Sequence, residues 1–557
     1  MTFLDPACGS GNFLTESFLS LRRLENEVLR LKVAADRKLT EGQISFGFDE
    51  ASPIRVSIHQ FYGIEINDFA VAVAQTALWI AESQMFRETE DIIHSHMEFF
   101  PLKEYKGIKE ANALRIDWND VVPREKLNYC YGNPPFVGAR WMSKEQKADV
   151  IKIFGEKWNG VGDLDYVCCW YKKSAELMEG NNIRTALVST NSISQGGAVT
   201  NLWRPLFQNG IHIDFAHRTF VWDSEASLKA HVHCVIIGFS SSLYNRDKII
   251  FDKGIKTVAS NINGYLLDTD NVFIDKRMKP ISDVPTISLG GQAIDDGNLV
   301  LTQEEKEDLL VKEPIAEMFI RPYMMGKDFI NRRPRFCLWL VDAEPSILKK
   351  CPLVLERVIK VKNFREESNR ASTLRAANTP TLFASILECN GEYIAIPKVS
   401  SENRRYIPMD YLPGNIIPGD KLFVMQNATL YHFGVMTSNV HMAWMRAVCG
   451  RLKSDYSYSN TIVYNNFPWP SPTDEQKATI EKTAQGILDA RALYPDASLA
   501  DLYDPLTMPP ELRKAHQAND RAVMQAYGMP IKETDEAACV AWLMRLYQEK
   551  VAELEKK

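Results

Sequence analysis

Thr2-Phe3-Leu4-Asp5-Pro6-Ala7-Cys8-Gly9-Ser10-Gly11-Asn12 is the stretch of sequence that decides the fold. Its first residues form a short apolar run, which predicts a strand, and the glycine-rich residues after Asp5 predict a turn. The segment after the turn predicts a helix, because its apolar residues recur close to a period of 3.6. These residues are Phe13, Leu14, Phe18, Leu21, Leu24 and Val28.

The alternation of strand and helix continues along the chain. Residues 61–64 form an apolar run that ends at Glu65, and Asn67 or Asp68 can cap the next helix. Further strands are predicted at 129–131, 185–189, 211–216 and 232–239, with a helix over 165–178. Successive strand–helix units imply parallel crossovers, and the last two strands indicate a hairpin. We expect an α/β fold with a doubly wound, Rossmann-like sheet and an antiparallel last hairpin.

Changes in sequence pattern predict three domains. The α/β pattern fills residues 1–242, whereas residues 243–470 mix short strand-like runs with Gly, Pro and Asn and predict a separate α+β domain. Residues 471–557 predict a C-terminal helical domain. The proline-rich stretch 468–472 is expected to be a stiff linker.

The composition is that of an ordinary globular protein. About 45% of the residues are apolar, and no stretch approaches the roughly 20 apolar residues of a membrane-spanning helix. The ten cysteines form no CxxC pair, so we expect neither a metal site nor a disulfide framework. The sequence shows no signal peptide, which indicates the cytoplasm. A net charge of −6 counts mildly against DNA binding, although local basic patches decide that property.

The glycine-rich turn is a candidate cofactor site. In doubly wound sheets, ligands bind at the carboxyl ends of strands, against the next helix N-terminus. Asp5 can hold an ammonium group, and Glu65 suits the hydroxyls of a ribose. The residues assigned to this site are Asp5, Pro6, Ala7, Cys8, Gly9, Gly11, Asn12 and Glu65. Taken alone, such a turn could equally be structural.

A second acidic residue extends this candidate site. Asp117 follows residues 112–116 and is expected at a strand end, where it could accept a hydrogen bond from an adenine amine of the cofactor. Trp118 or Ile66 could pack on the adenine ring. An exposed loop aspartate would explain Asp117 nearly as well.

Asn133, Pro134, Pro135 and Phe136 follow the strand predicted at 129–131 and form the candidate catalytic site. An aromatic exocyclic amine is a poor nucleophile, because its lone pair is delocalised into the ring. The Asn133 side-chain oxygen and the Pro134 carbonyl could bind the two amine hydrogens, and Phe136 could stack on the base. The prolines fix the turn. Attack of the amine on a sulfonium methyl group depends on positioning more than on acid–base groups. A base that carries this amine must leave the duplex to reach the site. Asn133 is also assigned to the cofactor site.

Together these residues resemble the gamma-type amino methyltransferases, whose cofactor motifs precede an Asn-Pro-Pro-aromatic motif. Four further segments look like the MmeI-type restriction-modification proteins; they are 189–193, 215–222, 450–456 and 465–470. The resemblance implies S-adenosylmethionine as cofactor, double-stranded DNA as partner and methylation of the N6 amine of adenine. It also implies that a second aromatic residue closes the pocket for the flipped base. Phe220 is assigned this role, with Trp222 as the alternative, although either could belong to the core.

Two features depart from the family pattern. The family places a nuclease domain and a helical spacer before the first cofactor motif, whereas only four residues precede Asp5. No Asp…Glu-x-Lys nuclease centre is evident, so we expect that this chain does not cut DNA by itself. A cofactor-covering segment is also missing, and an upstream nuclease or helical segment, or a partner chain, could supply it.

Basic residues gather in the second half of the chain and are candidate DNA contacts. Arg404, Arg405, Arg446, Arg451 and Lys453 are assigned to DNA binding. The wider set comprises Arg321, Lys327, Arg332, Arg333, Arg335, Arg357, Lys360, Lys362, Arg365, Arg370 and Arg375. Arg and Lys supply a salt-dependent hold on phosphates, but any one of these residues could belong to a solvated charged face.

Site-specific DNA adenine methylation is therefore the leading hypothesis. Methylation of RNA or of a protein glutamine uses similar motifs, but such enzymes are generally compact, and the large domain at 243–470 argues against them. A non-catalytic DNA-binding specificity fragment is the alternative from a different class. Transfer of a labelled methyl group to DNA, RNA or protein separates the three.

Overall fold

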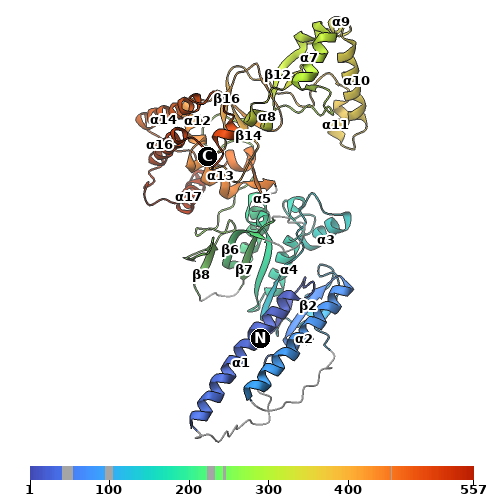
Figure 1. Ribbon diagram of the computed structural model, residues 1–557, viewed down its shortest axis with the longest axis vertical. Coiled ribbons are helices and arrows are strands. Elements are labelled where there is room, and N and C mark those ends of the chain that lie inside the picture. The colour runs from blue at the N-terminus through green and yellow to red at the C-terminus, as the bar shows by residue number, and fades with distance from the viewer. Residues whose placement is uncertain (40–53, 94–104, 223–231, 242–245, 453, 557) are drawn as a thin grey trace. The chain divides into compact units, whose positions relative to one another are not determined.

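The computed structural model describes residues 1–39, 54–93, 105–222, 232–241, 246–452 and 454–556 (Figure 1). Two compact units divide the chain, residues 1–273 and residues 274–557. The first unit contains the α/β sheet, and the second contains smaller sheets and the C-terminal helices. Within the described residues, none of the helices has the length and apolar character needed to cross a membrane.

The first unit is built on a sheet to which nine strands of the described residues contribute. In spatial order they are β3 (Ile108–Glu110), β2 (Phe61–Glu65), β1 (Phe3–Asp5), β4 (Tyr129–Gly132), β5 (Arg184–Thr190), β7 (Val232–Ser240), β6 (His212–Trp222), β8 (Lys248–Asp252) and β9 (Ile255–Ala259). Strands β3, β2, β1, β4 and β5 are parallel, and β7 runs antiparallel between β5 and β6. The fold class predicted from the sequence is confirmed.

The sheet extends beyond the hairpin that was predicted to be its last. β8 pairs parallel with β6 along Phe215↔Ile249, and β9 pairs antiparallel with β8. Both strands lie after residue 242, where the sequence analysis places the end of the first domain. Residues of β9 are mostly exposed, so this edge of the sheet carries a weak apolar signal in the sequence.

Helices of the first unit flank this sheet. They are α1 (Asn12–Leu39), α2 (Asp68–Ile93), α3 (Lys144–Phe154), α4 (Cys168–Met178), α5 (Gly196–Ala198) and α6 (Arg204–Gln208). Figure 1 shows α1 and α2 side by side, and the buried Arg22 of α1 donates to the Thr89 hydroxyl of α2 at 2.7 Å. Phe3 and Phe61 of the neighbouring strands β1 and β2 stack at 4.9 Å, and Phe18 of α1 meets Phe61 edge-on. Apolar side chains thus fix β1 beside β2 and under α1.

The second unit is built from three small sheets. The first holds β10 (Ile287–Leu289), β18 (Leu422–Gln426), β14 (Tyr393–Pro397) and β16 (Asp410–Leu412). The second holds β11 (Val300–Leu301), β13 (Phe336–Leu338), β12 (Ile320–Met324) and β17 (Ile417–Pro418). The third holds β15 (Val399–Ser400), β20 (Asp455–Ser457) and β19 (Gly450–Leu452).

Helices of the second unit come in two groups along the chain. The earlier group comprises α7 (Gln303–Lys312), α8 (Gly326–Asn331), α9 (Pro345–Leu348), α10 (Pro352–Glu366) and α11 (Ala371–Ala376). The later group comprises α12 (Leu430–Met436), α13 (Asn439–Val448), α14 (Asp474–Ala492), α15 (Leu499–Leu502), α16 (Pro510–Ala526) and α17 (Glu536–Glu555). The Asn519 amide of α16 donates to the Gly434 carbonyl of α12, so the C-terminal helices pack within the same unit as the strands.

The prediction of a stiff linker at 468–472 is wrong for its first residues. Trp469 is 2% exposed, and its ring lies among the rings of Tyr431, His432 and Tyr464. The Pro468 carbonyl accepts a hydrogen bond from the Tyr527 hydroxyl at 2.8 Å. The prolines alone suggest a spacer, but the tryptophan beside them buries enough apolar surface to fasten the segment.

Arg365 is not a phosphate contact, contrary to the sequence analysis. Its side chain is fully buried in α10, and its guanidinium donates to five backbone carbonyls. The acceptors are the carbonyls of Ala293, Ile294, Ala376, Thr379 and Leu382. Arg365 therefore ties residues 293–294 and the segment 376–382, which begins at the end of α11, to α10.

We expect Arg365→Ala to lower the free energy of unfolding of the second unit by at least about 3 kcal/mol, because it leaves buried carbonyls without a donor. Urea unfolding followed by circular dichroism measures this change. Lys360→Ala, an exposed position on the same helix, is the matched control and should change stability by less than about 0.5 kcal/mol. Equal stability of the two variants would contradict the role of Arg365.

Candidate active site

The glycine-rich turn after β1 is held by hydrogen bonds from its backbone amides to β2, one to a backbone carbonyl and one to a side chain. The Cys8 amide donates to the Ile64 carbonyl at 3.1 Å, and the Gly9 amide donates to Glu65 Oε2 at 2.9 Å. Gly11 has a φ of +80°, and a Cβ at this position would lie 2.8 Å from the Ala74 Cβ of α2. Gly11 is therefore required both for its backbone conformation and for the close approach of α2.

Glu65 lies at the carboxyl end of β2, next to the turn. Besides the Gly9 amide, its carboxylate accepts from the amides of Ile66 and Asn67 at 2.9 and 3.0 Å. A carboxylate offers about four acceptor positions, so the three amides leave room for one further donor. The side chain is thus oriented by the backbone on both sides of it.

Asp5 ends β1 and is completely buried. Its Oδ1 accepts from the Ala7 amide at 3.0 Å, whereas Oδ2 is buried without a hydrogen-bond partner in the described structure. Burial, opposed by that hydrogen bond and reinforced by the charge of Glu65, raises the pKa of Asp5 to about 7. A buried carboxylate with one unpartnered oxygen is costly, and Oδ2 is available to accept a hydrogen bond from a bound cation.

Asp5 also joins the glycine-rich turn to the tetrapeptide Asn133–Phe136. β1 and β4 are neighbours in the sheet, with Phe3 opposite Tyr129 and Leu4 opposite Cys130. A Cβ built on Gly132, the last residue of β4, would lie 2.4 Å from Asp5 Oδ1. The Asp5 carboxyl therefore lies against the backbone that leads directly into Asn133.

The tetrapeptide continues from β4 as irregular backbone and contains a buried polar atom. Asn133 Oδ1 is buried and has no hydrogen-bond partner in the described structure. Pro134 is buried, Pro135 is exposed and the Phe136 side chain is half-buried. An unpartnered amide oxygen at the end of a strand is a ready acceptor for a donor brought by a ligand.

Two residues that the sequence analysis missed hold the glycine-rich turn and the segment after the tetrapeptide. The Trp170 indole of α4 donates to the Pro6 carbonyl at 3.1 Å and so holds the glycine-rich turn. Asp165 Oδ1 accepts from the Ala139 amide at 2.9 Å, and its Oδ2 accepts from the Ser192 hydroxyl at 2.6 Å. The sequence placed both residues on a predicted helix but contained no signal for these long-range contacts.

The three residues proposed to hold an adenine ring differ in their exposure to solvent. Asp117 is exposed and lies in a turn beyond β3, not at its end, where Oδ1 caps a helical turn by accepting from the Asn119 amide. Trp118 is 2% exposed and donates to the Ala113 carbonyl, so its ring belongs to the interior. Ile66 is 67% exposed beside Glu65 and is free to pack on a ligand.

Phe220 and Trp222 lie on the second half of β6. Phe220 pairs with Cys234 of β7 and is half-buried, and the two aromatic rings are 6.3 Å apart. The two side chains occupy neighbouring positions on one strand face, so the assignment of Phe220 with Trp222 as alternative stays a prediction.

The residues assigned to DNA binding differ in the exposure and ion pairing of their side chains. Arg446 forms a two-bond ion pair with Glu536, and Arg451 is bound by Glu402 and lies 4.2 Å from the Tyr456 ring centroid. Arg404 is half-buried and Arg405 is exposed. Lys453 lies outside the described residues. Arg405 thus offers the most accessible cation of the described members.

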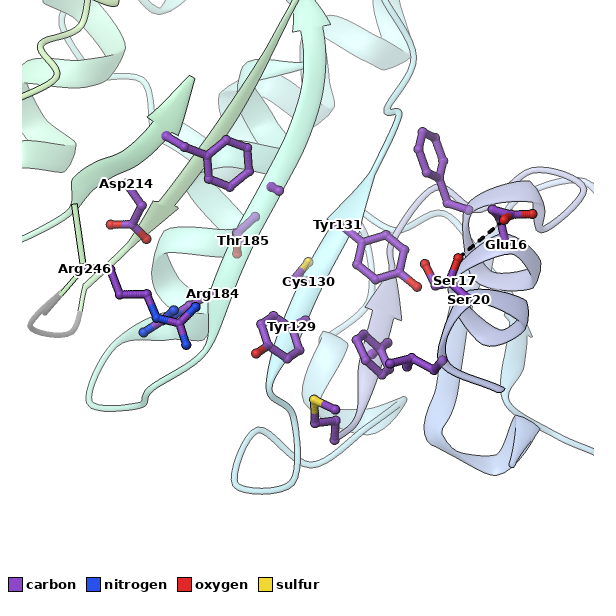
Figure 2. Close-up of a pocket in the computed structure, with 16 residues that line it drawn as sticks. Glu16, Ser17, Ser20, Tyr129, Cys130, Tyr131, Arg184, Thr185, Asp214 and Arg246 are labelled. Carbon is purple, nitrogen blue, oxygen red and sulfur yellow. Dashed lines mark hydrogen bonds between the residues drawn. The ribbon is translucent and has the colours of Figure 1, made fainter. Parts of the chain in front are cut away.

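An apolar hollow of about 630 Å³ lies on one face of the sheet beside α1. Figure 2 shows Glu16, Ser17 and Ser20 projecting from α1 towards it, with Tyr129 and Tyr131 on β4. None of the predicted site residues lines this hollow. In the part of the chain that the structure describes, no group of His, Cys, Asp and Glu could hold a metal ion.

Three family models match consecutive parts of the chain. Residues 1–252 match the model "MmeI, DNA-methyltransferase domain", and residues 268–471 match "MmeI, target recognition domain". Residues 472–555 match "MmeI, C-terminal domain". The first model includes the glycine-rich turn and the tetrapeptide, and the second includes most of the basic residues.

Two relatives extend this similarity to nearly the whole chain. DNA methyltransferase A of Bacillus subtilis (strain 168) is 39% identical over 550 residues, which cover 98% of this chain and 61% of that protein. The structure of the type IIL restriction-modification enzyme MmeI in complex with DNA matches with a TM-score of 0.88 and 43% identity. That match covers 99% of this chain and 73% of the MmeI chain. The chain therefore spans less than two thirds of the length of the Bacillus relative.

Asp5→Asn is expected to raise the free energy of unfolding at pH 8 by at least about 1 kcal/mol, because it removes a buried charge. The pKa of Asp5 rises from 3.8 to about 7 on folding, so folding takes up a proton between these pH values. The contribution of Asp5 to stability therefore falls as pH rises from about 4 to about 7.

Chemical unfolding at pH 5 and pH 8 measures this dependence. The gain from Asp5→Asn should be larger at pH 8 than at pH 5, while Asp120→Asn, an exposed control, should have no effect. A loss of stability at both pH values would show that the Asp5 carboxylate is satisfied by a contact within the chain.

Proposed function

The chain belongs to the MmeI family, and from this premise we propose that it is a site-specific DNA methyltransferase. The reaction is the transfer of a methyl group from S-adenosylmethionine to the N6 amine of an adenine flipped out of duplex DNA. One observation carries the proposal: the Asp5 carboxyl lies against Gly132, so the cofactor turn meets the residue before Asn133. A bound cofactor and an amine held by Asn133 would then be neighbours.

The glycine-rich turn fits S-adenosylmethionine on two observations. Asp5 Oδ2 is a buried acceptor without a partner, which suits the ammonium of the methionine part. A Cβ built on Gly9 would meet no atom within 4 Å, so the turn has open space over its backbone. Glu65 keeps one acceptor position for a ribose hydroxyl, and the exposed Ile66 can cover the adenine ring.

Asn133 and Pro134 provide the amine-binding half of the site. The Asn133 side-chain oxygen and the Pro134 carbonyl accept the two hydrogens of the N6 amine and favour a pyramidal nitrogen. Phe136 stacks on the flipped base, and Phe220 closes the pocket, with Trp222 as the alternative. S-adenosylmethionine supplies an electrophilic methyl group, and the chain contributes position and the exclusion of water.

Residues 268–471 supply the reading of the DNA sequence in this proposal. Arg405 is exposed and suits a phosphate contact, whereas Arg446 and Arg451 would have to leave Glu536 and Glu402 to reach DNA. A DNA substrate and a role in a restriction-modification system support a cytoplasmic location. An upstream nuclease or helical segment, or a partner chain, would complete the system.

Gly132→Ala is expected to weaken S-adenosylmethionine binding by about tenfold or more, because the new methyl group displaces the Asp5 carboxyl and a charge-assisted hydrogen bond is lost. Isothermal titration calorimetry measures the affinity. Gly162→Ala, where an added Cβ meets no atom within 4 Å, is the control and should bind as the parent chain does. Unchanged affinity in Gly132→Ala would remove Asp5 from the cofactor site.

Asn133→Ala is expected to reduce methyl transfer to duplex DNA by at least about a hundredfold while the fold is retained, because one of the two amine acceptors is lost. Transfer of a labelled methyl group is measured with duplex DNA, RNA and a protein pool as substrates. Asn119→Ala, in an exposed turn of the same unit, serves as the control. Transfer to RNA or protein by the parent chain, or equal transfer by Asn133→Ala, would contradict the proposal.

A further inference from the structure

Trp141 stands apart from the other tryptophans of the chain. Its side chain is 86% exposed, whereas every other tryptophan of the described residues is buried or half-buried. It lies eight residues after Asn133, and the next residue, Met142, is buried. A tryptophan in water leaves a large apolar surface uncovered, so Trp141 presents a ring beside the tetrapeptide that is available to a binding partner.

The turn that presents Trp141 is held at both of its ends. The Trp141 amide donates to the Gly138 carbonyl at 2.8 Å, and the Ala139 amide donates to Asp165 at 2.9 Å. After Met142, Ser143 caps α3 by accepting from the Gln146 amide. The indole is therefore exposed by an ordered turn that starts from the candidate active site.

Basic side chains surround this tryptophan along the chain. Arg140, Lys144 and Lys147 are exposed, and Lys144 and Lys147 share one face of α3. The one carboxylate among residues 140–147, Glu145, accepts a hydrogen bond from the Ser143 hydroxyl at 2.7 Å. Three cations to one acid is a basic patch in a chain whose net charge is −6. We call Arg140, Trp141, Lys144 and Lys147 the Trp141 patch.

We propose that the Trp141 patch binds duplex DNA beside the target base, with the indole stacked on a nucleobase that base flipping exposes. Flipping unstacks the neighbouring bases, and an aromatic ring stacks on any base because each has a π-face. The cations hold the adjacent phosphates. This inference rests on the proposed function, since it takes DNA as the substrate and Asn133 as the place where the adenine is held.

Binding to a short fluorescein-labelled duplex of mixed sequence with one mismatched adenine tests the patch by fluorescence anisotropy. Trp141→Ala should weaken binding by about tenfold, whereas Trp141→Phe, which keeps a ring for stacking, should stay within about threefold of the parent chain. Lys144→Ala combined with Lys147→Ala should lower the slope of log affinity against log salt by about 1 to 2. Ile255→Ala and Lys256→Ala, both exposed on β9, are the matched apolar and charged controls.

The assignment is overturned if Trp141→Ala binds the duplex as tightly as Ile255→Ala does, or if the parent chain does not bind it at all. Melting temperatures of all variants should match, because each replaced side chain is exposed. Binding is measured without methyl transfer, so loss of the assignment leaves the Asn133→Ala experiment as a separate test of the proposed function. Conversely, a chain that binds through Trp141 but transfers no methyl group fails only the proposed function.

Discussion

The contact between the Asp5 carboxyl and Gly132 is the constraint on which the rest of the site depends. Two adjacent parallel strands, β1 and β4, end together, and the carboxyl of one lies over the backbone of the other, where no side chain at position 132 would fit. The same carboxyl faces the turn through the Ala7 amide. One side chain thus fixes the distance between the glycine-rich turn and the tetrapeptide that begins at Asn133.

The buried Asp5 carboxylate carries an energetic cost that protonation or a bound cation lowers. Asp5 is buried, its second oxygen has no partner in the described structure, and its pKa is raised to about 7. The unpartnered oxygen of Asn133 is a further unsatisfied acceptor at the same edge of the sheet. These two unpartnered oxygens destabilise the fold at the positions where a cation and an amine are expected to bind. Such local destabilisation is common at binding sites. Glu65 accepts hydrogen bonds from three amides, so its carboxylate destabilises the fold less than that of Asp5.

Local sequence was sufficient to predict the fold class and the motifs, because these depend on short patterns at strand ends. The glycine-rich turn, Glu65 and the tetrapeptide all follow apolar runs, and the structure has strands at those places. The family inferred from the motifs is confirmed by the matches over the whole chain. Contacts between distant segments were beyond reach: the burial of Trp118, Arg365 and Trp469 depends on neighbours that sequence spacing does not reveal. Asp165 and Trp170 were missed for the same reason, since each acts on a loop more than twenty residues away.

A crystal structure of the chain with a non-reactive analogue of S-adenosylmethionine tests the central claim most directly. We expect the amino group of the analogue to lie within hydrogen-bond distance of Asp5 Oδ2, and its methyl-donor position to face Asn133 and Pro134. An analogue bound elsewhere, for example in the apolar hollow beside α1, or an Asn133 side chain turned away from the bound analogue, would contradict it.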